Sequence, residues 1–415
     1  MANVHPFRAF RYAVKAGDLN SLITQPYDKI SPEMQSRYLR SSPYNLVRII
    51  LGERLPGDSE ANNVYTRAAG YLDEWIRDGI LAQDPEPAFF VYSQEFVDPD
   101  SGQRLARTGF IGLGDVEEYA GGVVHRHEQT LSGPKKDRLE LLRHTRAHFG
   151  QIFMLYPDRS GQIDAILNEM SCSAALARVT DDYGALHKLW PIADPAAIER
   201  IRALMAGKKL VIADGHHRYE TALAFSKECN LPGARRVMMT FVNMYSPGLR
   251  ILATHRVAGN LPGFDAAALL DRLAGLGAMQ EFPSVEALRQ ALAAPAPEAI
   301  RIGVALAGSP ALWLLTAVRG QGDLDVSFLH RQILDRILGI GEQAVREEKH
   351  LKYVRGMDAA VARVTDGGAQ MAFLLQPTTV EQVAEVSFGG GVMPQKSTDF
   401  YPKLLSGMTI YKLDG

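Results

Sequence analysis

The sequence contains few cysteines, and Cys172 and Cys229 are its only two in 415 residues. They lack the paired spacing that binds zinc, and two cysteines cannot form the disulfide framework of a small secreted fold. We therefore interpret both as small core residues. The composition excludes a disulfide-rich extracellular protein.

The sequence also lacks a long apolar stretch and an excess of charge of either sign. No run is long enough to cross a bilayer, and the first residues do not follow the basic, apolar and small-residue order of a signal peptide. The 45 basic and 47 acidic residues give a net charge of -2. We therefore expect a cytoplasmic protein with no membrane partner and no nucleic-acid partner, although a local basic patch is not excluded.

The length of 415 residues, with 46% hydrophobic and 22% charged residues, is typical of a soluble globular protein with a large core. Helical and strand patterns alternate along the chain without a repeat of fixed period. We predict a mixed α/β fold of the α+β class. Its predicted regions are a helical and loop region at 1–86, a core at 87–264 with an insertion near 157–205, and a further α/β region at 265–415.

The clearest change of pattern lies near the middle of the chain. Leu210 to Ala213 is a short apolar run typical of a strand, whereas the residues after Gly215 repeat at helical spacing. Asp214 and Gly215 are therefore predicted to form a tight turn, with Asp214 able to cap the new helix. Such a helix start favours an anion, because its first N–H groups are unpaired and the helix dipole is positive there.

The residues that follow this turn suit a phosphate. His216, His217 and Arg218 come directly after Gly215. Three or four hydrogen bonds to a charged ligand could together reach about 5–7 kcal/mol, which corresponds to millimolar to ten-micromolar binding of a nucleotide. The alternative is a capped helix whose histidines lie on the surface.

His127 and Glu128 form a second candidate site, in a charged loop that continues to Lys136 and Arg138. Phosphoryl transfer requires positive groups around the phosphates and a carboxylate that orients or deprotonates the attacking hydroxyl. These side chains are of the required kinds, and the alternative is a solvated surface loop. A metal site assembled from Glu128 and the histidines of both stretches is also open, although adjacent His and Glu do not share the helical face of a zinc-binding motif.

A glycine-rich stretch lies near the end of the sequence. Gly389 to Gly391 precede Lys396, Ser397 and Thr398, but neither the spacing nor a following helix matches a Walker loop. This bend, which continues to Lys403, could contact a bound phosphate from another domain. The alternative is a C-terminal clamp with structural duties alone.

The sequence resembles a large bacterial and archaeal family known as domain of unknown function 1015 (DUF1015). Four separated stretches carry the resemblance and cover most of the chain. They are Gln25-Pro26-Tyr27-Asp28, His127-Glu128-Gln129-Thr130-Leu131, Asp214-Gly215-His216-His217-Arg218-Tyr219, and Met393-Pro394-Gln395-Lys396-Ser397-Thr398 with Phe400-Tyr401-Pro402-Lys403.

The turn that begins at Asp214 also resembles that of free-serine kinases built on the ParB/sulfiredoxin-like fold. This resemblance implies a ParB/sulfiredoxin-like core with additional N- and C-terminal α/β regions. It further implies that the turn holds nucleotide phosphates and that Glu128 is the base for the serine hydroxyl. Sulfiredoxin chemistry is disfavoured because no cysteine occupies the turn, and ParB-type DNA clamping is disfavoured because no helix-turn-helix or basic surface is evident.

The leading hypothesis is a kinase that uses ATP or ADP with Mg²⁺ and phosphorylates a hydroxyl of a small metabolite, with free L-serine as the first candidate. Alternatives are a nucleotide-binding regulatory protein without transfer and a metal-dependent hydrolase. The sequence does not predict the oligomeric state. The candidate catalytic residues are Glu128 and Asp214, and the candidate nucleotide-binding residues are His127, Gly215, His216, His217, Arg218, Lys396, Ser397 and Thr398.

Overall fold

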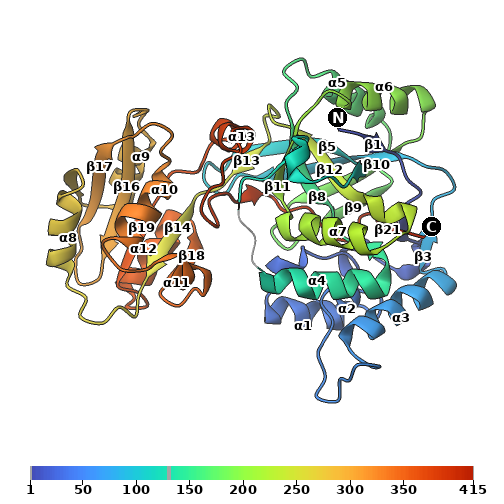
Figure 1. The fold of residues 1–415 in the computed structure, drawn as a ribbon, viewed down its shortest axis with the longest axis horizontal. Helices are drawn as coiled ribbons and strands as arrows, with labels where there is room; N and C mark the ends of the chain where they lie inside the picture. Colours follow the sequence, from blue (N-terminus) through green and yellow to red (C-terminus); the bar gives the residue numbers. More distant parts are fainter. Residues whose placement is uncertain (1, 129–131, 415) are drawn as a thin grey trace. The chain divides into compact units, whose positions relative to one another are not determined.

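The computed structural model describes residues 2–128 and 132–414, so that Gln129, Thr130 and Leu131 of the second motif lie outside the described residues. The chain forms two compact units, named here unit 1 (residues 1–250 and 400–415) and unit 2 (residues 251–399). Each combines helices with sheets (Figure 1), which confirms the predicted α+β class. The boundaries of these two units differ from those of the three regions predicted from the sequence, which were 1–86, 87–264 and 265–415. The three regions stay a prediction.

Unit 1 is built around a mixed β-sheet. Its strands run in the order β6-β11-β8-β12-β5-β4-β10-β9, and β1 pairs with β5. The strands are β1 Val4–His5, β4 Phe89–Val97, β5 Arg104–Asp115, β6 Val124–His125, β8 Ile152–Tyr156, β9 Ala177–Thr180, β10 Leu186–Ile192, β11 Leu210–Asp214 and β12 Arg236–Asn243.

Helices lie on both sides of this sheet, with α5 and α6 on one side and α4 and α7 on the other (Figure 1). The helices are α1 Pro32–Ser41, α2 Val47–Ile50, α3 Val64–Arg77, α4 Ser132–Thr145, α5 Gln162–Met170, α6 Pro195–Met205 and α7 His216–Glu228. Short strands complete the unit, namely β2 Phe10–Tyr12, β3 Leu81–Gln83, β7 Ala147–His148, β20 Phe400–Tyr401 and β21 Tyr411–Lys412.

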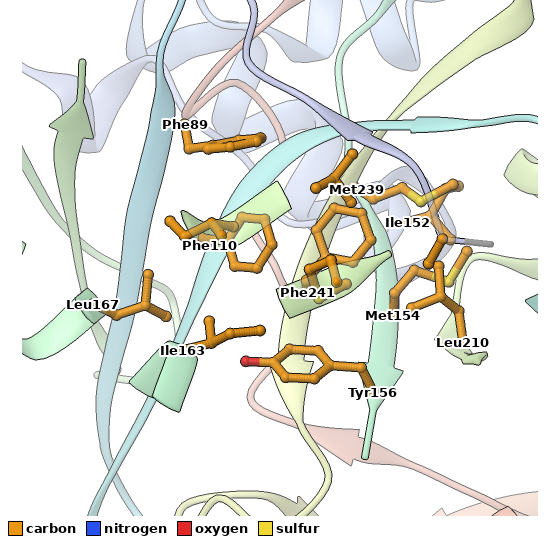
Figure 2. Close-up of a cluster of buried hydrophobic side chains, with 14 of the residues drawn as sticks. Phe89, Phe110, Ile152, Met154, Tyr156, Ile163, Leu167, Leu210, Met239 and Phe241 are labelled. Carbon is orange, nitrogen blue, oxygen red and sulfur yellow. The ribbon is translucent and has the colours of Figure 1, made fainter. Parts of the chain in front are cut away.

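Alternation along the strands gives the main sheet two different faces. On β8, Met154 points into the hydrophobic core of unit 1, where Phe110 and Phe241 stack with their ring centroids 4.8 Å apart (Figure 2). The neighbouring Phe153 points to the opposite face, because successive side chains of a strand alternate, and there it lies under the guanidinium of Arg107. One face is therefore apolar, whereas the other carries polar groups beside the candidate site.

The C-terminal segment returns to unit 1 and forms part of its interior. Residues 400–411 are buried. Ile410 exchanges backbone hydrogen bonds with Phe10, and Ser406 does so with Thr24. β21 pairs with β7 in antiparallel fashion. Segments from both ends of the chain thus meet beside the central strands.

Unit 2 has a separate antiparallel sheet with the strand order β15-β17-β16-β19-β14-β18. Side chains from α9 and α12 pack against it around Leu288, Leu314 and Val361. Its elements are β14 Thr254–Ala258, α8 Ala266–Ala274, β15 Ala278–Phe282, α9 Val285–Ala293, β16 Ala299–Leu306, β17 Leu312–Val318, α10 Asp325–Phe328, α11 Glu342–Arg346, β18 Leu351–Arg355, α12 Met357–Thr365, β19 Met371–Leu374 and α13 Val380–Phe388, with a π-helical turn at Leu329–Asp335.

Two boundaries differ from what the local sequence pattern predicts. The pattern of residues 249–257 predicts a single strand, but the chain forms β13 (Arg250–Ile251) and then β14, because it passes from unit 1 to unit 2 there. The helical pattern through Leu139 and Leu142 predicts a helix that reaches His148, but α4 ends at Thr145, and His148 belongs to β7. Within the described residues, no helix has both the length and the apolar character needed to cross a membrane.

Candidate active site

The predicted strand, turn and helix around Asp214 are present as β11, Gly215 and α7. Gly215 adopts a φ of 97°, a left-handed conformation that side chains disfavour. A β-carbon there would also lie 3.1 Å from a nitrogen of the Arg218 guanidinium. Glycine is therefore required at this turn both for its backbone conformation and for the close approach of Arg218.

Asp214 is not the cap of α7, contrary to one sequence-based expectation. The N-cap is Gly215, which has no side chain to accept from the first N–H groups of the helix. The Asp214 carboxylate instead accepts hydrogen bonds from Arg218 Nη2 at 2.8 Å and from Lys403 Nζ at 3.1 Å. The opening N–H groups of α7 thus keep their anion-binding character.

A β-bulge at the end of β11 explains the direction of Asp214. The register shifts after Ile212, so that Asp214 lies opposite Phe153 of β8. Without the extra residue, Asp214 would share the apolar face of Ile212, because alternate residues of a strand share one face. The bulge therefore turns the carboxylate to the polar face of the sheet.

Three cations surround this carboxylate. Burial by itself would raise the pKa of Asp214, but the charges of Lys403, Arg218 and Lys29 outweigh it and hold the pKa well below its ordinary value. Asp214 is therefore ionised at neutral pH. The positive charges outnumber the carboxylate that they face, which favours a further anion.

Arg218 fixes the geometry of the turn as well as supplying charge. Besides Asp214, it donates from Nη1 to the carbonyl oxygen of Gln151 at 2.5 Å. It also lines a cavity of about 70 Å³ with Pro26 and Tyr27 of the first motif. The Arg138 guanidinium lies over the Tyr27 ring, 4.2 Å from its centroid. Residues of the first and third motifs thus meet at one cavity.

The two buried histidines of the motifs touch each other. The rings of His127 and His216 meet edge to face with centroids 4.7 Å apart. Burial lowers the pKa of His127 to about 4, and burial also lowers the pKa of His216 well below its ordinary value. Both rings are therefore neutral near pH 7. His127 Nδ1 is 2.7 Å from the carbonyl oxygen of Ile212 and, in the neutral ring, donates to it.

The contacts of His127 bring Glu128 to the same end of β11 as Asp214. β6 pairs with β11 in parallel, so that both strands end at one edge of the sheet. Glu128 lies three positions after His125, where this pairing ends, and is itself half-buried. The carboxyl edge of parallel strands is where α/β proteins bind ligands. The two separated stretches expected to cooperate therefore lie side by side.

The other candidate residues differ in their surroundings. His217 is partly exposed in the first turn of α7, and its carbonyl oxygen accepts from the Thr221 hydroxyl. The Nε2 atom of His216 is buried and has no hydrogen-bond partner among the described residues. Within the same residues, no cluster of three or more His, Cys, Asp or Glu side chains is placed to hold a metal ion.

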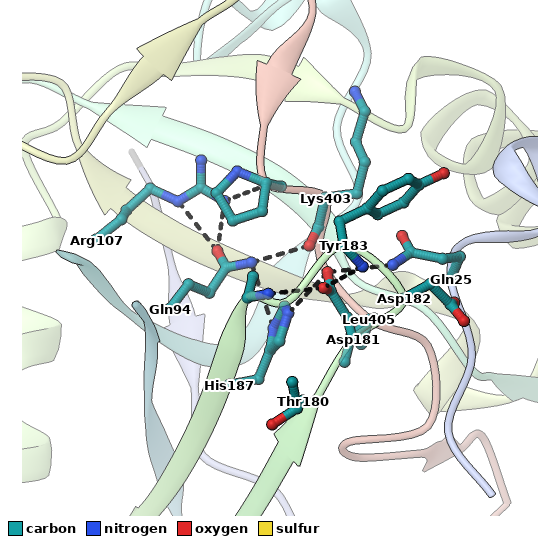
Figure 3. A network of polar contacts seen from close by, with 12 residues as sticks. Gln25, Gln94, Arg107, Thr180, Asp181, Asp182, Tyr183, His187, Lys403 and Leu405 are labelled. Atoms are coloured by element: carbon teal, nitrogen blue, oxygen red, sulfur yellow. Dashed lines mark hydrogen bonds and ion pairs between the residues drawn. The ribbon is translucent and has the colours of Figure 1, made fainter. Parts of the chain in front are cut away.

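Lys403 and Lys29 contribute charge to the site but were not among the candidate residues assigned from the sequence, although one interpretation of the bend that continues to Lys403 was that it contacts a phosphate. The backbone of Lys403 is held from the polar face of the sheet (Figure 3). Arg107 donates to the carbonyl oxygens of Tyr401 and Pro402 at 3.0 and 2.6 Å, and Gln94 Nε2 donates to that of Lys403 at 2.9 Å. The Phe400-to-Lys403 stretch was noticed in the sequence. The sequence alone did not indicate that this stretch belongs to unit 1.

Lys396, Ser397 and Thr398 belong to unit 2. Lys396 adopts a left-handed φ of 57°, and its carbonyl oxygen accepts from Arg256 at 3.1 Å. The Ser397 hydroxyl donates to the carbonyl oxygen of Pro394 at 2.5 Å. These three residues are therefore described within unit 2, and their assignment to a phosphate stays a prediction.

A family model described as a protein of unknown function (DUF1015) matches residues 4–327. The chain belongs to the DUF1015 family. This confirms the family resemblance, and the first three motifs lie within the matched residues, whereas the fourth, at residues 393–403, lies outside them. Among curated proteins, none matches the sequence of this DUF1015 member.

Several solved structures are similar to this chain at low identity and low TM-score. A conserved hypothetical protein from Pyrococcus furiosus is 13% identical with a TM-score of 0.36, covering 70% of this chain and 93% of its own. A free serine kinase in complex with AMP is 13% identical with a TM-score of 0.37, covering 69% and 88%. SbnI from Staphylococcus aureus, with a C-terminal truncation, is 10% identical with a TM-score of 0.33, covering 73% and 82%.

Proposed function

We propose that this DUF1015 protein is a nucleotide-dependent kinase that transfers phosphate from ATP or ADP to a hydroxyl of a small metabolite, with free L-serine as the first candidate. One observation carries the proposal. The uncapped start of α7, a group of cations and a second carboxylate, Glu128, gather at the carboxyl edge of β6 and β11. No nucleic acid or membrane is required as a partner.

The phosphate-binding part of the proposal uses backbone and side-chain donors together. The opening N–H groups of α7 supply aligned donors and the positive end of the dipole. Lys403, Arg218 and Lys29 supply the charge that already lowers the pKa of Asp214. Each hydrogen bond to a charged phosphate contributes about 1.5–3 kcal/mol. A few of them support nucleotide binding without a Walker loop.

In the proposed reaction, Glu128 orients the acceptor hydroxyl and accepts its proton. The hydroxyl oxygen forms a bond to the terminal phosphorus of the nucleotide. The bond from that phosphorus to the bridging oxygen breaks, so that ATP leaves as ADP, or ADP as AMP. Because the transition state is loose, positioning and positive charge contribute more than the basicity of Glu128.

The residues at this edge fit Mg²⁺, which is usually held by one or two protein carboxylates together with substrate phosphates. Glu128 and Asp214 are carboxylates at the ends of neighbouring strands. When bound, Mg²⁺ would neutralise charge on the phosphates. Asp214 already accepts from Arg218 and Lys403, so its oxygens are shared with these cations.

The test of the catalytic role is Glu128→Gln. We expect nucleotide affinity to be retained and turnover to fall by roughly 10²–10⁴, as for loss of a general base. Formation of ADP or AMP is measured against a panel of amino acids and sugars. Glu53→Gln is the matched control, because Glu53 is an exposed glutamate of unit 1. Wild-type turnover in Glu128→Gln on a confirmed acceptor would refute the role.

A second candidate is a nucleotide sensor that does not transfer phosphate. The observation in its favour is that Arg218 and Lys403 are already paired with Asp214, so a ligand can act by exchanging these ion pairs. Isothermal titration with ATP, ADP and CTP, together with the acceptor panel, separates the two candidates. Nucleotide binding without acceptor-dependent turnover would favour the sensor.

A further inference from the structure

Unit 2 contains a cavity of its own, with a volume of about 360 Å³. Its walls come from the end of α9, from β16, from the start of α10 and from the segment that leads into α13. All of the residues that line it belong to unit 2. The volume is that of a small-molecule site, and the cavity is separate from the candidate active site in unit 1.

Positive charge predominates in the lining. Arg256, Arg301 and Arg319 face one acid, Asp325. Arg319 donates to Asp325 at 2.6 Å and to three backbone carbonyl oxygens, so this pair stabilises the wall. Arg256 donates to the carbonyl oxygens of Thr254, Gln395 and Lys396. Both arginines therefore hold the cavity in shape.

Arg301 has a different position. It is nine-tenths buried on β16, and its Nη1 donates to the carbonyl oxygen of Ala294 at 2.5 Å. A guanidinium has five N–H donors in a planar fork. The charge of Arg301 also acts on Asp325, but the one side-chain hydrogen bond found among the described residues leaves N–H donors of the fork that can bind a carboxylate or a phosphate in the cavity. Arg301 is thus the cation best placed to contact a ligand.

The neutral side chains around the cavity also suit an oxygen-rich ligand. Gln376 and Gln382 line it with the start of α13. The Gln382 amide oxygen accepts from the Thr379 N–H in the helix cap, which leaves its amide N–H groups as donors. The positive end of the α13 dipole adds to the field of Arg301. Apolar residues such as Leu292 and Val326 complete the wall.

The fourth family motif is part of this wall. Ser397 lines the cavity, and Arg256 fixes the bend before it through the carbonyl oxygens of Gln395 and Lys396. The Thr378 hydroxyl donates to the carbonyl oxygen of Ser397 at 3.0 Å. Residues 393–398 of the motif therefore have a structural setting within unit 2, whereas Phe400 to Lys403 belong to unit 1.

We propose that unit 2 binds a small anionic metabolite, a carboxylic acid or a phosphomonoester, in this cavity, with Arg301, Gln376 and Gln382 as its contacts. Both ligand types carry a negatively charged group with at least two oxygens, which a guanidinium can bind through two parallel hydrogen bonds. This site lies beyond the proposed kinase reaction, and its failure leaves the kinase proposal unaffected.

The full-length protein is titrated by calorimetry in phosphate-free buffer with L-malate and with glycerol 3-phosphate. These two probes distinguish a carboxylate from a phosphomonoester. Arg301→Gln is expected to weaken binding of the active probe by about ten- to a hundredfold, as for loss of a hydrogen bond to a charged group. Arg363→Gln is the matched control, because Arg363 is an exposed arginine of unit 2 outside the cavity. It should bind like wild type.

Gln376→Met is the second variant, since Gln376 is half-buried and the change is close in volume. A severalfold loss of affinity in this variant supports the site even if Arg301→Gln fails to fold. The proposal would be overturned if neither probe bound at concentrations up to about 10 mM, because a dissociation constant above this corresponds to less than about 3 kcal/mol of binding free energy. Equal affinity in wild type, Arg301→Gln and Gln376→Met would also overturn it.

Discussion

Replacing Asp214 by asparagine removes the one carboxylate that Arg218 and Lys403 share, while it preserves the shape of the side chain. The structure predicts opposite effects of Asp214→Asn on two quantities. The free energy of unfolding should fall, because Arg218 and Lys403 each lose an ion pair. The affinity for inorganic phosphate should rise, because the same two cations become available to an anion.

The size of the stability loss follows from the geometry. Lys403 Nζ and Asp214 Oδ1 are 3.1 Å apart, a separation at which the attraction is about 5 kcal/mol at an effective dielectric constant of about 20. Desolvation offsets part of it, and removing one partner of a buried pair costs about 3–5 kcal/mol. The Lys403 side chain is 8% exposed and that of Asp214 is 21% exposed, so this range applies to Asp214→Asn.

Lys403→Met should cost less, about 1–3 kcal/mol, because Arg218 still neutralises the carboxylate after the lysine is gone. The double variant should cost less than the two single changes added together, since contacting residues couple. Urea unfolding of the four proteins measures these values. Asp214→Asn should lose more stability than Lys403→Met because cations outnumber the carboxylate at this site. This order does not depend on the dielectric constant chosen.

The phosphate effect is measured by repeating the unfolding curves with added phosphate. Phosphate that binds tenfold more tightly adds about 1.4 kcal/mol more to the free energy of unfolding at saturation. We expect added phosphate to stabilise Asp214→Asn by about this much more than it stabilises the wild type. Lys403→Met should show no gain. The reasoning would be refuted if Asp214→Asn were as stable as Lys403→Met, or if phosphate stabilised the wild type and Asp214→Asn equally.

Three further predictions concern the support of the site. Gly215→Ala should cost about 1–3 kcal/mol in urea unfolding because of its left-handed φ, whereas Gly70→Ala, in open space on helix α3, should be stabilising by up to about 1 kcal/mol. Arg107→Met should cost at least about 3 kcal/mol, since it leaves buried carbonyl groups unpaired, and should speed tryptic cleavage after Lys403. Stability should fall as the pH drops from about 6.5 to about 4, because the unfolded chain takes up a proton that folded His127 resists. His127→Asn should reduce the slope of this dependence by the contribution of one proton in unfolding curves recorded across that pH range, because other buried histidines such as His216 contribute the rest.

Local patterns in the sequence were sufficient to predict many individual elements. The amphipathic repeat from Val64 to Arg77 coincides with α3, and the run from Ile152 to Tyr156 coincides with β8. Ser31 caps α1 by accepting from the Met34 N–H, as its position before a proline indicated. Such elements depend on neighbouring residues, and therefore a single sequence contains the information that specifies them.

Long-range pairing is not encoded in this local way. The hydrophobic run of β11 predicts a strand, but nothing in Leu210 to Asp214 indicates that β6 pairs beside it. The bulge after Ile212 depends on the partner strand β8, so the direction of Asp214 could not be predicted. Lys403 is more than 180 positions from Asp214 in the chain, and tertiary contacts such as those of Arg107 and Gln94 with the C-terminal segment hold it there.

The arrangement around Asp214 also has a consequence for ligand affinity. Lys403 is held in a buried position without ligand, and a buried lysine requires a counter-charge to remain ionised. Asp214 supplies that charge, and its contacts orient the side chains of Lys403 and Arg218. A nucleotide must then exchange for an existing ion pair, and the net gain is smaller than the sum of its contacts. We therefore expect moderate affinity for an anion with little reorganisation of the site, which is compatible with the proposed kinase and with the proposed sensor.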